Sequence, residues 1–420
     1  MKKTDRTSAR YGRDGKMTPR RSNALDRRQQ KLERQWEQDR AWQAGVERVR
    51  HGVDRPMLII ILVLLCIGIV MVFSASFPYA IREGRSSMYY GLLHLAFAGV
   101  GLVLMMIAAL APYHVYKSVA PILFYLTVIL LLLVPIIGVS HKGAKRWLPL
   151  GPLGQFQPSE IAKFALTMML AWYIDKHYAK SSTRLSNRDS FVHGVLVPGL
   201  ILATICGLVL IEKHLSGMVI LAAIGVCVIF LSGANIGQMA LCYGTSAVVA
   251  ITAYLLKNSY ALQRILTHSD ENADALVEAW QTTQGLFAIG SGGLLGVGLG
   301  ESRLKYNYVS EAHNDFVFTI WCEEMGFVGA VLVVGLYVLF IWRGVTIAKK
   351  APDTFSSLVA FGITCQVGIQ AFLNIMVVTA VIPNTGISLP FCSYGGTSLM
   401  ILLAEMGVLL SISKHSFQKK

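Results

Sequence analysis

Charged residues are scarce in this sequence. Only 15% of its 420 residues are Asp, Glu, Lys or Arg, whereas 54% are hydrophobic. A water-soluble protein of this length needs a larger charged surface, so the composition excludes an ordinary soluble enzyme. The hydrophobic residues also fall in runs of about 20, the length at which a helix crosses the hydrocarbon core of a bilayer. The sequence therefore predicts a membrane protein.

Patterns that mark covalent or metal cross-links are also missing. No Cys-x-x-Cys pair occurs, and no cysteine shows the spacing of a zinc site. Each cysteine lies inside or beside an apolar run, so we interpret all of them as small buried hydrophobes and predict neither disulfides nor metal ligands. The seven are Cys66, Cys206, Cys227, Cys242, Cys322, Cys365 and Cys392.

The formal net charge of +14 is concentrated near the N-terminus, where residues 1–56 contain sixteen Lys and Arg against eight Asp and Glu. Such a segment occurs in nucleic-acid-binding arms, but it is also typical of a cytoplasmic tail beside anionic lipids. We favour the tail and predict no nucleic-acid partner. With too few apolar residues for a core, it is expected to be flexible. No cleavable signal peptide is predicted, because the first apolar run begins only near Met57.

Ten apolar segments follow the tail and predict an all-α, polytopic fold with ten transmembrane helices. They span roughly residues 57–77, 89–111, 117–139, 158–176, 191–212, 216–233, 237–256, 315–342, 356–380 and 397–413. An even number of crossings places both termini, including residues 414–420, in the cytoplasm. Cations in residues 176–188 and 343–350 agree with this topology. Within the membrane domain of residues 57–413, a large external loop, residues 257–314, separates the seventh and eighth helices.

Two of the predicted external loops carry cations against the usual bias. Lys142, Lys145 and Arg146 lie in the first, and Arg303 and Lys305 lie in the second. External cations in membrane proteins are uncommon but tolerated, so alone they prove nothing. Because the same loops hold the densest motifs, we interpret these cations as ligands for an anionic substrate.

The long external loop contains a glycine-rich stretch from Gln281 to Gly300. Its first half has the composition of a short helix lying in the membrane interface, and the glycines of its second half cannot continue that helix. A phosphate-binding P-loop is excluded, because no Gly-Lys-Ser/Thr follows and no strand precedes. The stretch therefore predicts a short helix followed by a re-entrant loop.

Ionisable residues also occur inside the predicted spans, where they are expensive. Glu160 and Lys163 are spaced i, i+3 and can pair on one helix face, most simply as a structural ion pair. Glu323 and Glu324 lie about two turns into the eighth span, and Glu405 lies in the tenth. These three glutamates are compatible with a proton path or with hydrogen-bonded packing groups.

The densest polar cluster is Glu311-Ala312-His313-Asn314-Asp315-Phe316, where the long loop enters the eighth span. A carboxylate at this depth can act as the base in a reaction on a membrane-anchored substrate, with nearby cations neutralising a leaving phosphate. The alternative is an acid that caps the helix. Residues 381–398 contain two prolines and three glycines, so they cannot form a regular helix and are expected to line the same site.

Four blocks of sequence together resemble the SEDS family, the FtsW, RodA and SpoVE proteins of bacterial wall synthesis. The resemblance covers roughly residues 57–413, in the order and with the number of spans typical of that family. The blocks are residues 142–147 with 156–163, residues 281–300, residues 308–326, and residues 383–398 with their Ser-Tyr-Gly-Gly run. The stretches 299–306 and 314–316 look more like the FtsW and SpoVE branch than RodA.

The resemblance implies a peptidoglycan glycosyltransferase that polymerises lipid II, the undecaprenyl-pyrophosphate-linked precursor, outside the cell membrane. Asp315 matches the family's essential aspartate and is the implied general base. The predicted substrate-binding residues are Lys142, Lys145, Arg146, Arg303, Lys305, Glu311, His313, Ser393 and Tyr394. Glu160, Lys163, Glu323 and Glu324 are predicted to be structural polar groups.

The resemblance also implies partners: a class B penicillin-binding transpeptidase, other division proteins and membrane lipids, at the division septum. No tightly bound cofactor is predicted, although the pyrophosphate makes Mg²⁺ or Mn²⁺ plausible. Three alternatives stay open. They are a flippase for the lipid-linked precursor, a scaffold for division proteins, and a RodA- or SpoVE-type role in elongation or sporulation.

Overall fold

The computed structural model describes residues 46–47, 52–141, 144–149, 155–179, 187–246, 277–306, 308–309, 312–415 and 418–419. The chain forms two compact units. Residues 1–49 and 417–420 form the smaller unit and residues 50–416 the larger one. In the smaller unit, β1 (Val46–Glu47) pairs antiparallel with β5 (Gln418–Lys419). Of the predicted tail, residues 1–56, the structure also describes residues 52–56, and α2 already begins at Arg55. The remainder of the tail lies outside the described residues.

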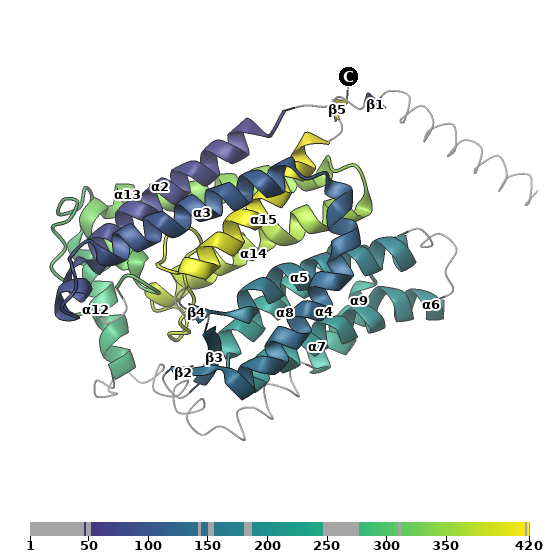
Figure 1. Cartoon of the computed structure of the whole chain (residues 1–420), viewed down its shortest axis with the longest axis horizontal. Helices are drawn as coiled ribbons and strands as arrows, with labels where there is room; N and C mark the ends of the chain where they lie inside the picture. The colour runs from purple at the N-terminus through teal and green to yellow at the C-terminus, as the bar shows by residue number, and fades with distance from the viewer. Residues whose placement is uncertain are drawn as a thin grey trace, which may run out of the picture. The chain divides into compact units, whose positions relative to one another are not determined.

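The larger unit is a bundle of helices (Figure 1). Its helices are α2 (Arg55–Arg82), α3 (Tyr89–Leu110), α4 (Tyr113–Ile137), α5 (Pro158–Ile174), α6 (Asn187–Phe191), α7 (Val197–Ile211), α8 (Leu215–Leu231), α9 (Ile236–Met239), α12 (Val277–Ser291), α13 (Val317–Lys349), α14 (Thr354–Val378) and α15 (Gly396–Lys414). Short π-helical turns, η2 (Asp175–Ala179), η3 (Val192–Leu196) and η4 (Ala240–Gly244), follow α5, α6 and α9. The predicted all-helical class is therefore confirmed.

Seven helices in the described residues are long and apolar enough to cross a membrane. They comprise α2, α3, α4, α13, α14 and α15, and the continuous helical stretch Arg188–Ile211 that contains α7. The 17-residue helices α5 and α8 match two more predicted spans. Of the span predicted at 237–256, the second half lies outside the described residues. The protein is thus a multi-pass membrane protein, and the count of ten stays a prediction.

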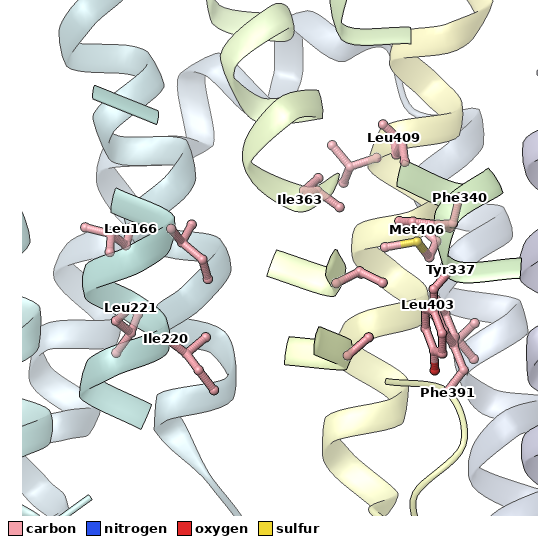
Figure 2. Packing of buried hydrophobic residues seen from close by; sticks show 14 of the residues in the cluster. Leu166, Ile220, Leu221, Tyr337, Phe340, Ile363, Phe391, Leu403, Met406 and Leu409 are labelled. Carbon is pink, nitrogen blue, oxygen red and sulfur yellow. The ribbon is translucent and has the colours of Figure 1, made fainter. Parts of the chain in front are cut away.

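Small residues let the helices approach closely. Gly101 of α3 lies against α15, where a Cβ atom would come within 2.5 Å of Leu403. A Cβ atom at Gly407 of α15 would lie 2.3 Å from the Met105 carbonyl oxygen of α3. Helices in lipid associate by such close packing, since burial from water no longer drives them together. Figure 2 shows Leu403 of α15 within the core, near side chains of α13 and of the loop between α14 and α15.

The cysteines only partly match the prediction. All seven lie in described residues and are free thiols, so the absence of disulfides is confirmed. Cys322 and Cys392 are buried, four others are half-buried, and Cys66 is exposed on α2. The prediction that all are buried is wrong, because an apolar run in a bundle has one face toward the other helices and one face outward.

A small antiparallel sheet was not predicted. It consists of β2 (Val139–His141), β3 (Ala144–Pro149) and β4 (Gln155–Phe156), with Val139 opposite Trp147 and Leu148 opposite Phe156. This sheet follows α4 and carries Lys145 and Arg146. Its strands are too short to show a period in the sequence.

Helix α13 is kinked, and the kink receives the glycine-rich loop, residues 292–300. Gly326 has φ 65° and ψ −164°, which breaks the helix between its first and second parts. The backbone groups freed by the kink bond to the loop, since Val297 donates to the Glu323 carbonyl at 3.0 Å and Phe327 donates to the Gly293 carbonyl at 2.9 Å. Buried backbone groups at membrane depth need such partners.

The predicted change from helix to loop within residues 281–300 is confirmed, because α12 ends at Ser291. The loop needs glycine for close approach as well as for turning. A Cβ atom at Gly292 would lie 2.1 Å from the Cys322 carbonyl oxygen, and one at Gly296 would lie 2.0 Å from the Glu324 carbonyl oxygen. Gly296 also has φ 81°, which other residues rarely adopt.

Candidate active site

Asp315 lies in the turn immediately before α13 and is half-buried. Its carbonyl oxygen accepts a hydrogen bond from the Asn374 side chain of α14 at 2.8 Å. The same Asn374 amide donates to the carbonyl of Ile387 at 2.6 Å, in the terminal loop, residues 379–395, between α14 and α15. Asn374 therefore ties the Asp315 turn to the terminal loop.

The terminal loop also approaches the carboxyl group of Asp315. A Cβ atom at Gly386, which has φ 67°, would lie 3.4 Å from Asp315 Oδ2. The adjacent Thr385 carbonyl accepts a hydrogen bond from the Ser216 hydroxyl at the start of α8. The Gly386 region of residues 381–398 therefore lies beside Asp315, and the role of this segment in a substrate site stays a prediction.

His313 and Tyr394 are brought together at the same place. The Tyr394 backbone N–H donates to the His313 carbonyl at 2.9 Å, and their rings lie 5.8 Å apart. His313 is buried, and its ring lies 4.5 Å from that of Tyr79 on α2. Burial raises the pKa of Tyr394 to about 12, so its hydroxyl stays protonated at neutral pH. Ser393 is buried and accepts from the Leu389 N–H at 2.7 Å, which shapes the loop.

Lys305 was expected to be an external cation that binds substrate, but its side chain is buried. Its side chain is 2% exposed, and its ammonium nitrogen lies 2.9 Å from Glu324 Oε1. The ammonium also donates to Ser74 of α2 at 3.0 Å and to the Gly300 carbonyl at 2.6 Å. Lys305 is therefore an internal cation that joins α2, α13 and the glycine-rich loop, and we do not assign it to substrate.

Glu323 fixes the start of the segment that contains Lys305. It accepts from the Ser302 hydroxyl at 2.5 Å and from the Arg303 N–H at 2.9 Å. Together with Glu324 it forms a buried network of fixed hydrogen bonds. The described contacts therefore place both glutamates as packing groups, the second of the two alternatives that the sequence left open.

Replacing Lys305 with methionine is expected to destabilise the protein by about 3–5 kcal/mol, because Glu324 would stay buried without a compensating charge. The double variant Lys305→Met/Glu324→Gln should recover much of this loss, since it removes both charges. Thermal unfolding in detergent measures the effect. Lys349→Met, at an exposed position on α13, is the matched control. Equal losses in the single and double variants would contradict the ion pair.

The other predicted cations are found near the surface. The Arg303 side chain is exposed, Lys145 is exposed with its ammonium 3.2 Å from the Pro135 carbonyl, and Arg146 donates to the Lys213 carbonyl at 2.6 Å. Lys142 and Glu311 lie outside the described residues. The structure therefore places three of the predicted cations, Lys145, Arg146 and Arg303, near the surface.

Glu160 and Lys163 form the predicted ion pair on one face of α5, with 3.0 Å between Lys163 Nζ and Glu160 Oε1. Lys163 also donates to the Gln370 side chain of α14 at 3.0 Å, and Gln370 donates to the Ser388 carbonyl of the terminal loop at the same distance. This chain of contacts extends from α5 to the terminal loop, so it connects the ion pair to the loop that lies beside Asp315.

These groups line a small cavity between α5, α14, α15 and the terminal loop. Glu405 of α15 also lines it, and one of its oxygens accepts from the Gln366 side chain at 2.7 Å. Among the described residues, no group of three or more His, Cys, Asp or Glu side chains is arranged to hold a metal ion.

Sequence reasoning missed Asn374, Ser74 and Gln370. Each is a polar residue inside a predicted apolar span or at its edge, and that rarity was the available signal. It gave no indication of their partners, which lie on other helices.

Comparison with known proteins identifies the family of the chain. A protein-family model described as "Cell cycle protein", for FtsW, RodA and SpoVE, matches residues 55–418. Two relatives are "Probable peptidoglycan glycosyltransferase FtsW" of Geobacter sp. strain M18 and "Stage V sporulation protein E" of Bacillus subtilis strain 168. Each is 36% identical and covers 86% of this chain and 97% of its own length.

Solved structures are similar as well. RodA of Thermus thermophilus matches with a TM-score of 0.64 and 27% identity, covering 87% of this chain and 98% of its own. A chain from a structure titled "Structural coordination of polymerization and crosslinking by a peptidoglycan synthase complex" matches with a TM-score of 0.69 and 26% identity, covering 86% and 97%. Residues 55–418, which the family model matches, include the Asp315 turn, the glycine-rich loop and the terminal loop. The protein belongs to the FtsW/RodA/SpoVE family.

Proposed function

We propose that this protein is a peptidoglycan glycosyltransferase that polymerises lipid II into glycan strands at the outer face of the cytoplasmic membrane. The observation that carries this proposal is the position of Asp315 in this chain, which belongs to the FtsW/RodA/SpoVE family. It lies where the start of α13 and the terminal loop meet, tied to α14 by Asn374. Three parts of the chain thus fix the backbone of this aspartate at an end of the membrane bundle, where a lipid-anchored substrate can reach it.

In the proposed reaction, the 4-hydroxyl oxygen of the acceptor sugar attacks the anomeric carbon of the donor. The bond from that carbon to the pyrophosphate oxygen breaks, and undecaprenyl pyrophosphate leaves with the electron pair. Asp315 accepts the proton of the attacking hydroxyl, and the anomeric configuration inverts. Positive groups lower the barrier by stabilising charge on the leaving pyrophosphate, and we assign that part to Lys145, Arg146 and Arg303, with Lys142.

The function is tested with the full-length protein in lipid vesicles supplied with purified lipid II. We expect polymeric glycan, resolved by gel electrophoresis, and release of undecaprenyl pyrophosphate. A preparation that moves fluorescent lipid II across the bilayer but forms no polymer would instead support the flippase alternative.

We further propose a role in septal wall synthesis, with both termini in the cytoplasm, a class B penicillin-binding transpeptidase as partner and other division proteins contacting the basic tail. The similarity to an FtsW protein and the basic charge of residues 1–56 support this role. A fluorescent fusion should concentrate at midcell during division. Uniform side-wall fluorescence would favour the elongation role, and a spore septum the sporulation role.

A divalent cation stays a prediction. Among the described residues, no group of three or more His, Cys, Asp or Glu side chains is arranged to hold such an ion. No step of the proposed reaction is assigned to it.

A further inference from the structure

Five aromatic rings gather beside the Asp315 turn and form a cluster that the proposed reaction does not use. The aromatic cluster consists of Tyr79 of α2, Tyr89 and Tyr90 of α3, His313, and Tyr394 of the terminal loop. Ring centroids are 4.5 Å apart for Tyr79 and His313, 5.1 Å for Tyr89 and Tyr90, and 5.3 Å for Tyr90 and Tyr394. These are contact distances for aromatic rings.

The cluster extends from an exposed ring to a buried ring in the turn that carries the proposed base. Tyr89 is 39% exposed, Tyr79 and Tyr90 are half-buried, and His313 is 4% exposed. His313 precedes Asp315 by two residues, and its carbonyl is held by the Tyr394 N–H. Tyr89 thus leaves part of an aromatic ring open at one end of the cluster.

Three charged residues border the cluster: Glu83, Arg85, and Arg82, whose guanidinium lies 5.0 Å from the Tyr79 ring centroid. Glu83 accepts a hydrogen bond from the Tyr90 hydroxyl, and Arg85 Nε lies 3.4 Å from Glu83 Oε2. The Arg85 guanidinium lies over the Tyr89 ring, 4.4 Å from its centroid. The hydrogen bonds donated by Tyr90 and Tyr79 lower the pKa of Glu83, so its carboxylate is ionised at neutral pH. The border thus offers both a charged acceptor and a charged donor.

This combination suits one chemical class of ligand. A pyranose has C–H faces, whose weakly positive hydrogens pack on the negative face of an aromatic ring, and hydroxyl edges, which hydrogen-bond to carboxylates and guanidinium groups. A phosphate can pair with a guanidinium group but has no C–H face to pack on the rings, and a lipid tail packed here would desolvate Glu83 and Arg85 without replacing their hydrogen bonds.

We propose that the aromatic cluster, with Glu83 and Arg85, is a pyranose-binding subsite that holds a sugar ring beside Asp315. The inference rests on the proposed function, since it supplies a place for a sugar of that reaction. Two sources share this chemistry, the lipid-linked disaccharide and the glycan product, and the experiment below separates them. The competing explanation is that Tyr89 is a membrane-interface anchor, a common position for tyrosine.

The first test is steady-state kinetics with lipid II in vesicles. Tyr89→Ala should raise KM about three- to tenfold with kcat changed less, because an aromatic stacking contact is worth that much in affinity. Tyr89→Phe keeps the ring and should behave like the wild type. Tyr125→Ala is the matched control, since Tyr125 is an exposed tyrosine on α4 away from the cluster, with 62% of its surface exposed.

The second test does not depend on activity. Saturation-transfer NMR on the full-length protein in nanodiscs uses a soluble β-1,4-linked N-acetylglucosamine tetramer as the probe. Transfer to the tetramer that falls severalfold in Tyr89→Ala, but persists in Tyr89→Phe and Tyr125→Ala, supports a subsite for the glycan product. A KM effect without tetramer transfer supports a subsite for the lipid-linked sugar.

The two proposals fail in different ways. If the wild type makes no glycan but shows Tyr89-dependent transfer to the tetramer, the polymerase assignment is wrong and the subsite stands. If the wild type makes glycan while Tyr89→Ala keeps KM within about twofold and no Tyr89-dependent transfer occurs, the subsite is overturned and Tyr89 is an interface anchor.

Discussion

Polymerisation of lipid II is expected to fall by about two to four orders of magnitude when Asp315 is replaced with asparagine, the range that a positioned general base contributes. Asparagine has nearly the same size, so it can keep the position beside Gly386 and the backbone bond from Asn374. It cannot accept the proton of the attacking hydroxyl. The measurement is the initial rate of glycan formation from purified lipid II in vesicles.

Asp189→Asn is the matched control for this prediction, because Asp189 is an exposed aspartate in the short helix α6. It should polymerise lipid II at the rate of the wild type. Thermal unfolding should be the same for both variants, which separates loss of the base from loss of the fold. A rate for Asp315→Asn within about threefold of the wild type would remove Asp315 from the role of base.

Gly326→Ala is expected to destabilise the protein by about 3 kcal/mol or more, because two separate penalties add. The residue has φ 65°, a backbone conformation that alanine adopts only with strain. In addition, a Cβ atom there would lie 2.3 Å from the backbone nitrogen of Gly296 and 2.6 Å from the Leu294 carbonyl carbon. Backbone cannot move aside as a side chain can, so the glycine-rich loop must leave the kink.

Loss of this contact should also reduce polymerisation. The loop continues into the segment that presents Arg303, and Glu323 on the other side of the kink holds that segment. The matched control is Gly335→Ala, in the same helix, where a Cβ atom would meet nothing within 4 Å. We expect Gly335→Ala to unfold at the temperature of the wild type. Equal unfolding temperatures for the two variants would show that the loop does not depend on the kink.

The sequence was sufficient where the deciding forces are local. Apolar runs predicted the helices because a span of lipid requires a continuous apolar stretch, and α12 ends at Ser291 where glycines begin. The Glu160–Lys163 pair followed from helical spacing alone. The order of four sequence blocks also showed the family resemblance, which implied the lipid-linked substrate and the essential aspartate.

Other features depended on contacts between distant segments. Lys305 and Arg303 look alike in the sequence, yet one is buried against Glu324 and the other is exposed. The difference arises because Ser74, 250 positions before Glu324 in the chain, completes the pocket for the Lys305 ammonium. Local periodicity gives no information about such a partner.

The sequence by itself thus determined that this protein is a multi-pass helical membrane protein of the FtsW/RodA/SpoVE family, and which aspartate to examine. Only the tertiary structure decided which cations are internal, how Asn374 joins Asp315 to the terminal loop, and that aromatic rings from α2, α3 and two loops form one cluster. The physical reason is that span length and helical spacing are properties of single segments. Charge burial and ring contacts exist only after helices far apart in the chain have packed together.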